Sequence, residues 1–239
     1  MGKTKSVQIF GEAVSGLAES VLASGFPMRE GGFDRWWDDV RDLSEWMKGS
    51  GANWEGLGLS PERVEWCERQ VKRAIALGSC KGGESHDCYL CGVVVAFNIT
   101  APRYWYPEMQ RYHFAEIVSS TSTMHKLRSV CSSVLEGRAD WRGCFAEGAN
   151  EGVVRVALEA MGRVMDDASL GDHEKVRLVK GMLPESYLQT CRISTNYRQL
   201  KTWVRQRSGH RLEEWREVCE WAHTLPWFDD LCGCARDEG

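Results

Sequence analysis

The sequence predicts an α/β fold, with a mixed sheet on which long helices pack. Residues 92–99 form an apolar, β-branched run that is typical of a buried strand. This run leads into Ala101-Pro102, and because proline has no N–H to donate to a sheet, the strand should end there. Long helical patterns lie on both sides of it. The 239 residues, 43% of them hydrophobic, suffice for one full core, so we expect a single domain over 1–239 with a flexible tail at 232–239.

The other elements follow from local patterns. Residues 6–10 suggest a short strand and 12–23 a helix. A tryptophan-rich stretch, 29–58, has helical spacing around 33–47. Ser60 and Pro61 are typical of a helix start and predict a helix over 61–77, after which a loop carries Gly82-Gly83. Further helices are expected over 124–135, 152–167 and 172–182.

Composition limits the classes of partner. A net charge of −4 and a pI near 5.9 give no general electrostatic reason to bind nucleic acid or an anionic membrane surface directly. No apolar run approaches the roughly 18–20 residues of a membrane span, and no signal-peptide core is seen at the N-terminus. We therefore expect a cytoplasmic protein.

The ten cysteines are expected to be free thiols, because neither a secretion signal nor a small size favours a disulfide framework. Cys80, Cys88 and Cys91 with His86 suggest zinc, as does the pair Cys232 and Cys234. A zinc site normally presents two close ligand pairs at compatible spacing. That spacing is not met here, so we assign no metal.

The segment 103–125 has two interpretations. Its aromatic and polar residues fit an ordinary half-buried helix. However, five small hydroxyl residues at 119–123 compete with a helical backbone, and they could donate hydrogen bonds to a phosphate or a heterocycle.

Three anchors in one ungapped register carry a family resemblance: Ser85-His86-Asp87, Ala101-Pro102 and Arg111-Tyr112-His113. They resemble the Gly-His-Glu-Thr-Pro segment, the strand ending in Ala-Pro and the Arg-His-Arg triplet of the flavin-dependent thymidylate synthases, and look closest to a divergent, phage-type branch. The C-terminal half resembles the same family through Asn196-x-Arg198-x-Leu200, Arg207 eleven residues after the asparagine, and a Pro226-Trp227 ending.

The resemblance implies a flavin-dependent thymidylate synthase-like fold and an enzyme that uses FAD, methylenetetrahydrofolate and NADPH to convert dUMP to dTMP. It also implies a homotetramer with shared sites. Arg207 would be catalytic, stabilising negative charge on the pyrimidine ring. Cofactor contacts would fall on His86, Arg111, Tyr112, His113 and Asn196. Substrate contacts would fall on Glu108, Ser120, Ser122, Arg192 and Arg207.

Two departures concern the nucleotide phosphate. Met124 and Thr190 stand where the family has arginines, so Arg192, Lys126 or Arg128 must compensate or the substrate differs from dUMP. The alternatives are a pyrimidine nucleotide hydroxymethylase of the same fold, or a non-catalytic relative that only binds a nucleotide or a protein partner.

Overall fold

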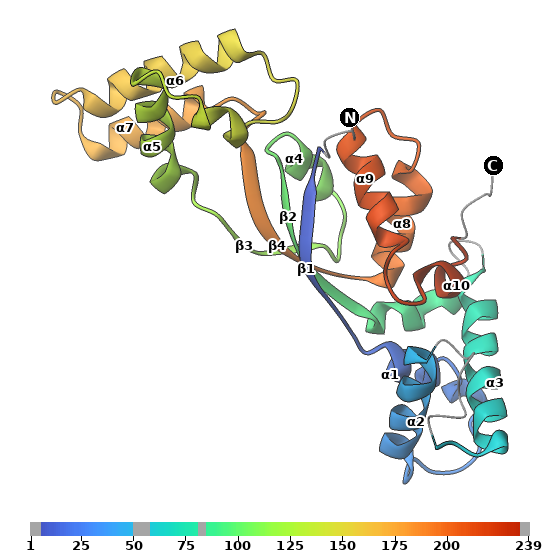
Figure 1. Cartoon of the computed structure of the whole chain (residues 1–239). Helices are drawn as coiled ribbons and strands as arrows, with labels where there is room; N and C mark the ends of the chain where they lie inside the picture. Colours follow the sequence, from blue (N-terminus) through green and yellow to red (C-terminus); the bar gives the residue numbers. More distant parts are fainter. Residues whose placement is uncertain (1–5, 50–57, 81–84, 235–239) are drawn as a thin grey trace. The chain divides into compact units, whose positions relative to one another are not determined.

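The computed structural model describes residues 6–49, 58–80 and 85–234 (Figure 1). Its sheet has four strands in the order β1-β2-β4-β3. The strands are β1 (Gln8–Ser15), β2 (Val94–Pro102), β3 (Glu116–Ser120) and β4 (Leu188–Asn196). The predicted α/β class is confirmed, but neighbouring strands run antiparallel and not in the mixed arrangement that we expected. Thr121 N–H, just after β3, donates to Thr190 O in β4 at 2.8 Å. The helices between β3 and β4 therefore lead the chain back to pair β4 with β3.

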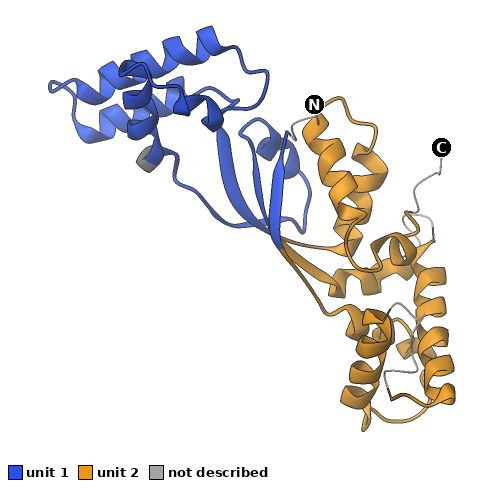
Figure 2. Cartoon of the chain, viewed as in Figure 1, with its two compact units in different colours: residues 1–11, 97–193 blue, residues 12–96, 194–239 orange. Residues whose placement is uncertain are grey.

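The chain divides into two compact units (Figure 2). Unit 1 comprises residues 1–11 and 97–193, and unit 2 comprises residues 12–96 and 194–239. Strands β1, β2 and β4 each begin in one unit and end in the other. A single domain over the whole chain stays a prediction.

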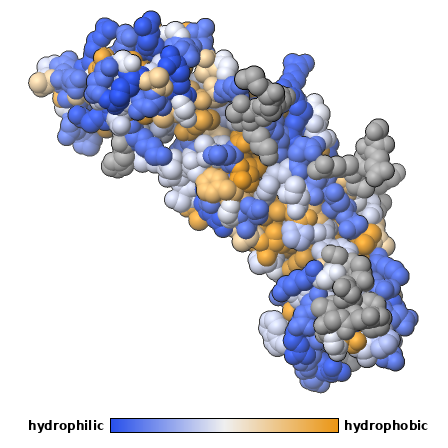
Figure 3. Space-filling view, in the orientation of Figure 1, coloured by the Kyte–Doolittle hydropathy of each residue, from blue (hydrophilic) through white to orange (hydrophobic). Residues whose placement is uncertain are grey.

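Unit 1 has its own hydrophobic core among α5 (Thr123–Leu135), α6 (Glu151–Asp166) and α7 (Asp172–Met182), with a 3-10 turn, η4 (Asp140–Cys144), beside them. Leu127, Leu158, Met161 and Val179 are fully buried there. On the face shown in Figure 3 these helices carry mostly hydrophilic residues. The three helices confirm the predictions at 124–135, 152–167 and 172–182. The short helix α4 (Trp105–Met109) follows β2.

Unit 2 is mostly helical. Its elements are α1 (Leu17–Ala23), η1 (Phe26–Met28), α2 (Trp36–Lys48), α3 (Pro61–Gly78), η3 (His86–Gly92), α8 (Tyr197–Arg207), α9 (Glu213–Ala222) and α10 (Phe228–Cys232). The predicted start of α3 is confirmed, since the Ser60 hydroxyl accepts from Arg63 N–H at 3.3 Å. In the tryptophan-rich stretch, Trp46 is buried and stacks on Trp227, whereas Trp37 is 72% exposed.

The helix predicted over 12–23 is wrong in part, and the half-buried helix that was one of the two interpretations of 103–125 is present only in part. Residues 12–15 belong to β1, and α1 begins only at Leu17. Gly16, at φ 75°, has a left-handed backbone conformation that separates the strand from the helix. A Cβ at position 16 would overlap the carbonyl oxygen of Gly92, so only glycine fits. Within 103–125 only Trp105–Met109 is an α-helix before α5, and pairing with β4 makes 116–120 a strand.

Some predictions fall on residues that the structure does not describe. These are Gly82-Gly83 and the tail beyond residue 234. The flexible tail predicted over 232–239 is wrong for Cys232 and Cys234, which are buried. All ten cysteines are free thiols. Among the described helices, none is both long and apolar enough to cross a membrane.

Gly78, at the end of α3, packs against the backbone of α10 at Leu231. A Cβ there would overlap the carbonyl oxygen of Leu231, which is backbone and cannot rotate away. We predict that Gly78→Ala lowers the free energy of unfolding by about 1–3 kcal/mol, the usual cost of overpacking. Gly209→Ala, in open space within the same unit, is the matched control and should change it by less than about 0.5 kcal/mol. Equal effects of the two variants in urea denaturation would contradict this packing.

Candidate functional site

The ten predicted site residues are divided between the two units. Unit 2 holds His86, Asn196 and Arg207. Unit 1 holds the other seven: Glu108, Arg111, Tyr112, His113, Ser120, Ser122 and Arg192.

In unit 1 the predicted flavin residues lie on the connection between α4 and β3. Buried Met109 anchors α4, and its carbonyl accepts from Tyr112 N–H at 3.0 Å. The connection borders an open hollow of about 740 Å³, lined by Gln110, Tyr112, His113, Phe114, Ala115, Glu116 and Ile117. Phe114 has φ 63°, unusual for a residue with a side chain, and is 70% exposed. Arg111 and His113 are exposed beside it, so the loop presents cationic and aromatic groups to solvent.

The predicted substrate residues of unit 1 lie on or near the sheet. Glu108 is half-buried in α4, while Ser120 and Ser122 are exposed at the end of β3 and the start of α5. The side chain of Met124 lies outside the described part of the chain. Arg192 donates from Nη1 to Gly11 O at 2.6 Å, which fixes its guanidinium against β1.

The hydroxyl of Thr190 lies 2.8 Å from that of Thr100 on the neighbouring strand β2. Its backbone N–H is 3.2 Å from Thr121 Oγ1. Thr190 therefore contributes to the pairing of the sheet at the position where the resembled family has an arginine.

In unit 2, Asn196 fixes the start of α8. Its side-chain oxygen accepts from Gln199 N–H at 2.9 Å, as an N-cap does. The helix then places Arg198 and Lys201, three residues apart, on one side. Arg207 is the last residue of α8.

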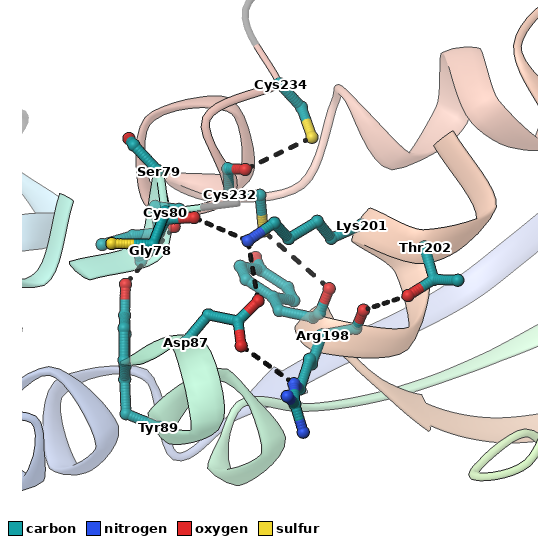
Figure 4. Close-up of polar contacts among 12 residues, drawn as sticks. Gly78, Ser79, Cys80, Asp87, Tyr89, Arg198, Lys201, Thr202, Cys232 and Cys234 are labelled. Atoms are coloured by element: carbon teal, nitrogen blue, oxygen red, sulfur yellow. Dashed lines mark hydrogen bonds and ion pairs between the residues drawn. The ribbon is translucent and has the colours of Figure 1, made fainter. Parts of the chain in front are cut away.

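Asp87 joins η3 to α8 through a buried ion cluster (Figure 4). Its Oδ2 accepts from Lys201 Nζ at 2.8 Å, and its Oδ1 from Arg198 Nε at 3.0 Å. Lys201 also donates to Gly78 O at 2.6 Å. Lys201 is 2% exposed and Asp87 6%, so the cluster holds the 3-10 turn that begins with exposed His86 against the helix that carries Asn196 and Arg207.

The two cations set the charge of Asp87. Burial favours the neutral acid, but the hydrogen bonds and positive charges of Lys201 and Arg198 outweigh it and lower the pKa of the carboxyl from its ordinary 3.8. Asp87 is therefore ionised at neutral pH, and the cluster carries one negative and two positive charges.

Arg207 is half-buried at the end of α8. Its Nη1 lies 2.8 Å from His210 Nε2, and its guanidinium carbon lies 5.0 Å from the centre of the Trp215 ring. Trp215 is fully buried and packs edge-on against Trp203. Because the indole cannot move, it holds the cation in place by a cation–π contact.

A larger hollow of about 890 Å³ lies within unit 2. Its described lining includes Pro226 and Trp227 of the C-terminal motif but none of the ten predicted residues. Among the described side chains, no group of three or more His, Cys, Asp or Glu could hold a metal ion.

Comparison with known proteins gives matches to solved structures only. No protein-family model matches the chain, and no curated protein does. Thymidylate Synthase X (ThyX) from Helicobacter pylori, solved with FAD and dUMP, matches with a TM-score of 0.54 at 19% identity, covering 80% of this chain and 91% of its own. A second structure described as the flavin-dependent thymidylate synthase ThyX, from the same organism and with the same ligands, matches with 0.53 at 18%, covering 82% and 95%.

The chain has the fold of the flavin-dependent thymidylate synthases. A UMP/dUMP methylase, PolB from Streptomyces cacaoi, bound with 5-Br dUMP, shares this fold with a TM-score of 0.55 at 14% identity, covering 95% of this chain and 94% of its own. The thymidylate synthase-like fold that the sequence motifs implied is thus confirmed.

Two residues of these contacts, Lys201 and Trp215, are not predicted from the sequence motifs. Asp87 stands where the resembled family has a glutamate, and Arg198 belongs to the Asn196-x-Arg198 motif, so both positions were already marked. A lysine three residues after that arginine, beside apolar Leu200 and Val204, was the available signal for a buried ion pair.

We predict that Asp87→Asn lowers the free energy of unfolding at pH 7 by about 3–5 kcal/mol, because it leaves the buried Lys201 charge uncompensated. The folded pKa of Asp87 is depressed, so its contribution is fully present above the ordinary pKa of 3.8 and is lost as the pH falls through the lower folded value. Urea denaturation between pH 7 and pH 2 should show this acid loss in the wild type, and correspondingly less of it in the variant.

Glu65→Gln is the matched control. Glu65 pairs with Arg69 on the surface of α3, with side chains 70% and 58% exposed. Such a pair contributes at most about 0.5 kcal/mol. If Asp87→Asn costs no more than Glu65→Gln, the buried cluster does not hold η3 to α8.

Proposed function

We propose that the chain is an FAD-dependent enzyme that transfers a one-carbon unit from methylenetetrahydrofolate to carbon 5 of a pyrimidine deoxynucleotide, converting dUMP to dTMP with NADPH as reductant. The observation that carries the proposal is the fold likeness over 80–95% of the chain. Two of the matched structures contain FAD and dUMP, and the third protein is a UMP/dUMP methylase bound with 5-Br dUMP.

The exposed groups of unit 1 fit a flavin in chemical terms. Tyr112, His113 and Phe114 offer planar rings at the hollow of about 740 Å³, and Arg111 offers a cation for the phosphates of FAD. FAD, when bound, would supply the redox chemistry and the relay of the one-carbon unit. The loop would hold and orient it.

Arg207 has the properties that polarising a pyrimidine requires. It is a permanent cation held in a fixed position by Trp215 and His210. A cation preset against a pyrimidine carbonyl stabilises the negative charge that develops on the ring as carbon 5 becomes nucleophilic. Asn196, at the opposite end of α8, would contact the flavin.

We expect the active form to be a homotetramer with shared sites, in which residues 108–125 and 196–207 reach one flavin from different chains. Sedimentation at the mass of a single 27.1 kDa chain would contradict this arrangement.

The direct test is turnover. Purified protein is incubated with FAD, NADPH, methylenetetrahydrofolate and dUMP, and the nucleotides are analysed by mass spectrometry, with each component omitted in turn. The proposal requires dTMP that depends on all four. A product carrying a hydroxymethyl group would identify a hydroxymethylase, and an unchanged dUMP pool in flavin-loaded protein would support a non-catalytic nucleotide-binding protein.

We predict that Arg207→Ala lowers turnover by at least about a hundredfold, the usual cost of removing a preset electrostatic contact to a developing charge. The variant should still fold and bind FAD, because the lost contact is to the pyrimidine. Flavin absorbance and turnover are measured on the same samples. Arg211→Ala removes an exposed arginine of unit 2 and is the control with unchanged turnover. Near-normal turnover in Arg207→Ala would show that this arginine does not act on the ring.

The nucleotide phosphate gives a further prediction. Met124 and Thr190 stand where the resembled family has arginines. Losing two charge-assisted bonds to the phosphate, at about 1.5–3 kcal/mol each, would weaken the binding of dUMP roughly a hundredfold or more. We expect Arg192 to compensate, using the guanidinium nitrogens that do not contact Gly11 O. Flavin-loaded protein is titrated with dUMP, UMP, dCMP and deoxyuridine.

Affinity for dUMP should be micromolar and should fall at least tenfold in Arg192→Ala. Arg155→Ala, which removes an exposed arginine of α6, should leave it unchanged. Equal affinity for dUMP and deoxyuridine would mean that the site does not recognise a phosphate.

A further inference from the structure

The turn η3 carries a Cys-x-x-Cys sequence, Cys88-Tyr89-Leu90-Cys91, to which neither the fold nor the proposed reaction gives a role. Both cysteines are exposed, whereas six of the other eight are buried and two are partly buried. The described residues offer no third ligand that would complete a metal site with them. The pair therefore has the accessibility that thiol chemistry needs.

The geometry of the turn brings the two sulfurs to one side. In a 3-10 helix the side chains at positions i and i+3 eclipse one another, and three residues rise about 6 Å along the axis. Disulfides join Cα atoms that are about 4.4–6.8 Å apart, so the backbone of η3 suits a bond between Cys88 and Cys91.

The two residues between the cysteines fix the turn. Leu90 is fully buried, and the Tyr89 hydroxyl donates to Ala74 O at 2.7 Å. Asp87, just before the pair, is held by Lys201. Because these neighbours point into unit 2, both thiols face outward on a rigid support.

A cation lies beside both thiols. Arg198, which forms an ion pair with Asp87 just before the two cysteines, also interacts electrostatically with Cys88 and Cys91. The thiolate is the form of cysteine that attacks a disulfide, and a nearby positive charge favours the approach of an anionic disulfide such as oxidised glutathione.

We propose that Cys88 and Cys91 form a redox-active dithiol that exchanges with low-molecular-weight disulfides of the glutathione type. The Cys91 thiolate attacks one sulfur of the disulfide, which forms a mixed disulfide and releases one thiolate. The Cys88 thiolate then attacks Cys91 Sγ, which closes the Cys88–Cys91 bond and releases the second thiolate. The two protons lost by the protein thiols go to the released thiolates, so the protein is oxidised by two electrons and the disulfide is reduced to two thiols.

The test uses the full chain incubated with oxidised glutathione, alkylated and digested with trypsin. Cleavage after Lys81 and Arg103 gives a peptide, 82–103, that contains Cys88 and Cys91 and no other cysteine, while Cys80 falls on the preceding peptide. We expect peptide 82–103 to lose two hydrogens and both alkylation sites, and dithiothreitol to restore them. Two alkylated cysteines after oxidation, or a cross-link between peptide 82–103 and the Cys80 peptide, would overturn the proposal.

Matched variants test which cysteines form the disulfide and whether Arg198 affects their reactivity. Cys88→Ser and Cys91→Ser should each leave one glutathione on the remaining cysteine of the peptide, and Cys80→Ser should behave as the wild type. Arg198→Gln should slow alkylation of the pair by iodoacetamide, and Arg198→Lys should restore the rate. An unchanged alkylation rate in Arg198→Gln would show that the arginine does not influence the reactivity of the two thiols. None of these readouts depends on enzyme turnover, so the inference stands or fails separately from the proposed reaction.

Discussion

The ionised carboxylate of Asp87 joins the elements of unit 2 that carry His86, Asn196 and Arg207. It is contributed by a short 3-10 turn that has little stability of its own, and it accepts hydrogen bonds from two cations on α8. Three elements are joined in this way, since Lys201 also bonds the C-terminal carbonyl of α3 at Gly78. Removing one partner from such a buried cluster leaves an uncompensated charge, so its members are mutually required.

Helix α8 carries cations at both of its ends. Arg198 and Lys201 near its start are engaged by Asp87, while Arg207 at its end rests on an aromatic ring and a histidine. The pyrimidine contact that we propose for Arg207 rests on its position at the end of α8 and on the rigid indole of Trp215 beside it.

The sequence predicted elements whose signals are local. Ser60-Pro61 marked the start of α3, helical periodicity found α5 to α7, and Pro102 marked the end of β2. It failed where tertiary pairing decides the structure. Strand β3 contains serines that fit a loop as well as a strand, and it forms because β4 lies beside it. The motifs predicted Arg207 and Asn196 as site residues, and their roles stay a prediction. Nothing local marks Trp215 as the ring beside Arg207, and the apolar neighbours of Lys201 indicate its burial but not its partner Asp87, which lies 114 residues away.

The central claim is that this fold binds a flavin, and the absorbance spectrum of the protein tests it most directly. The protein is purified, incubated with FAD, freed of unbound cofactor by gel filtration, and scanned in the visible range. Our account predicts a yellow protein whose flavin bands change in shape relative to free FAD when dUMP is added, because the nucleotide is expected to stack near the ring. A colourless protein that retains no added FAD would contradict it.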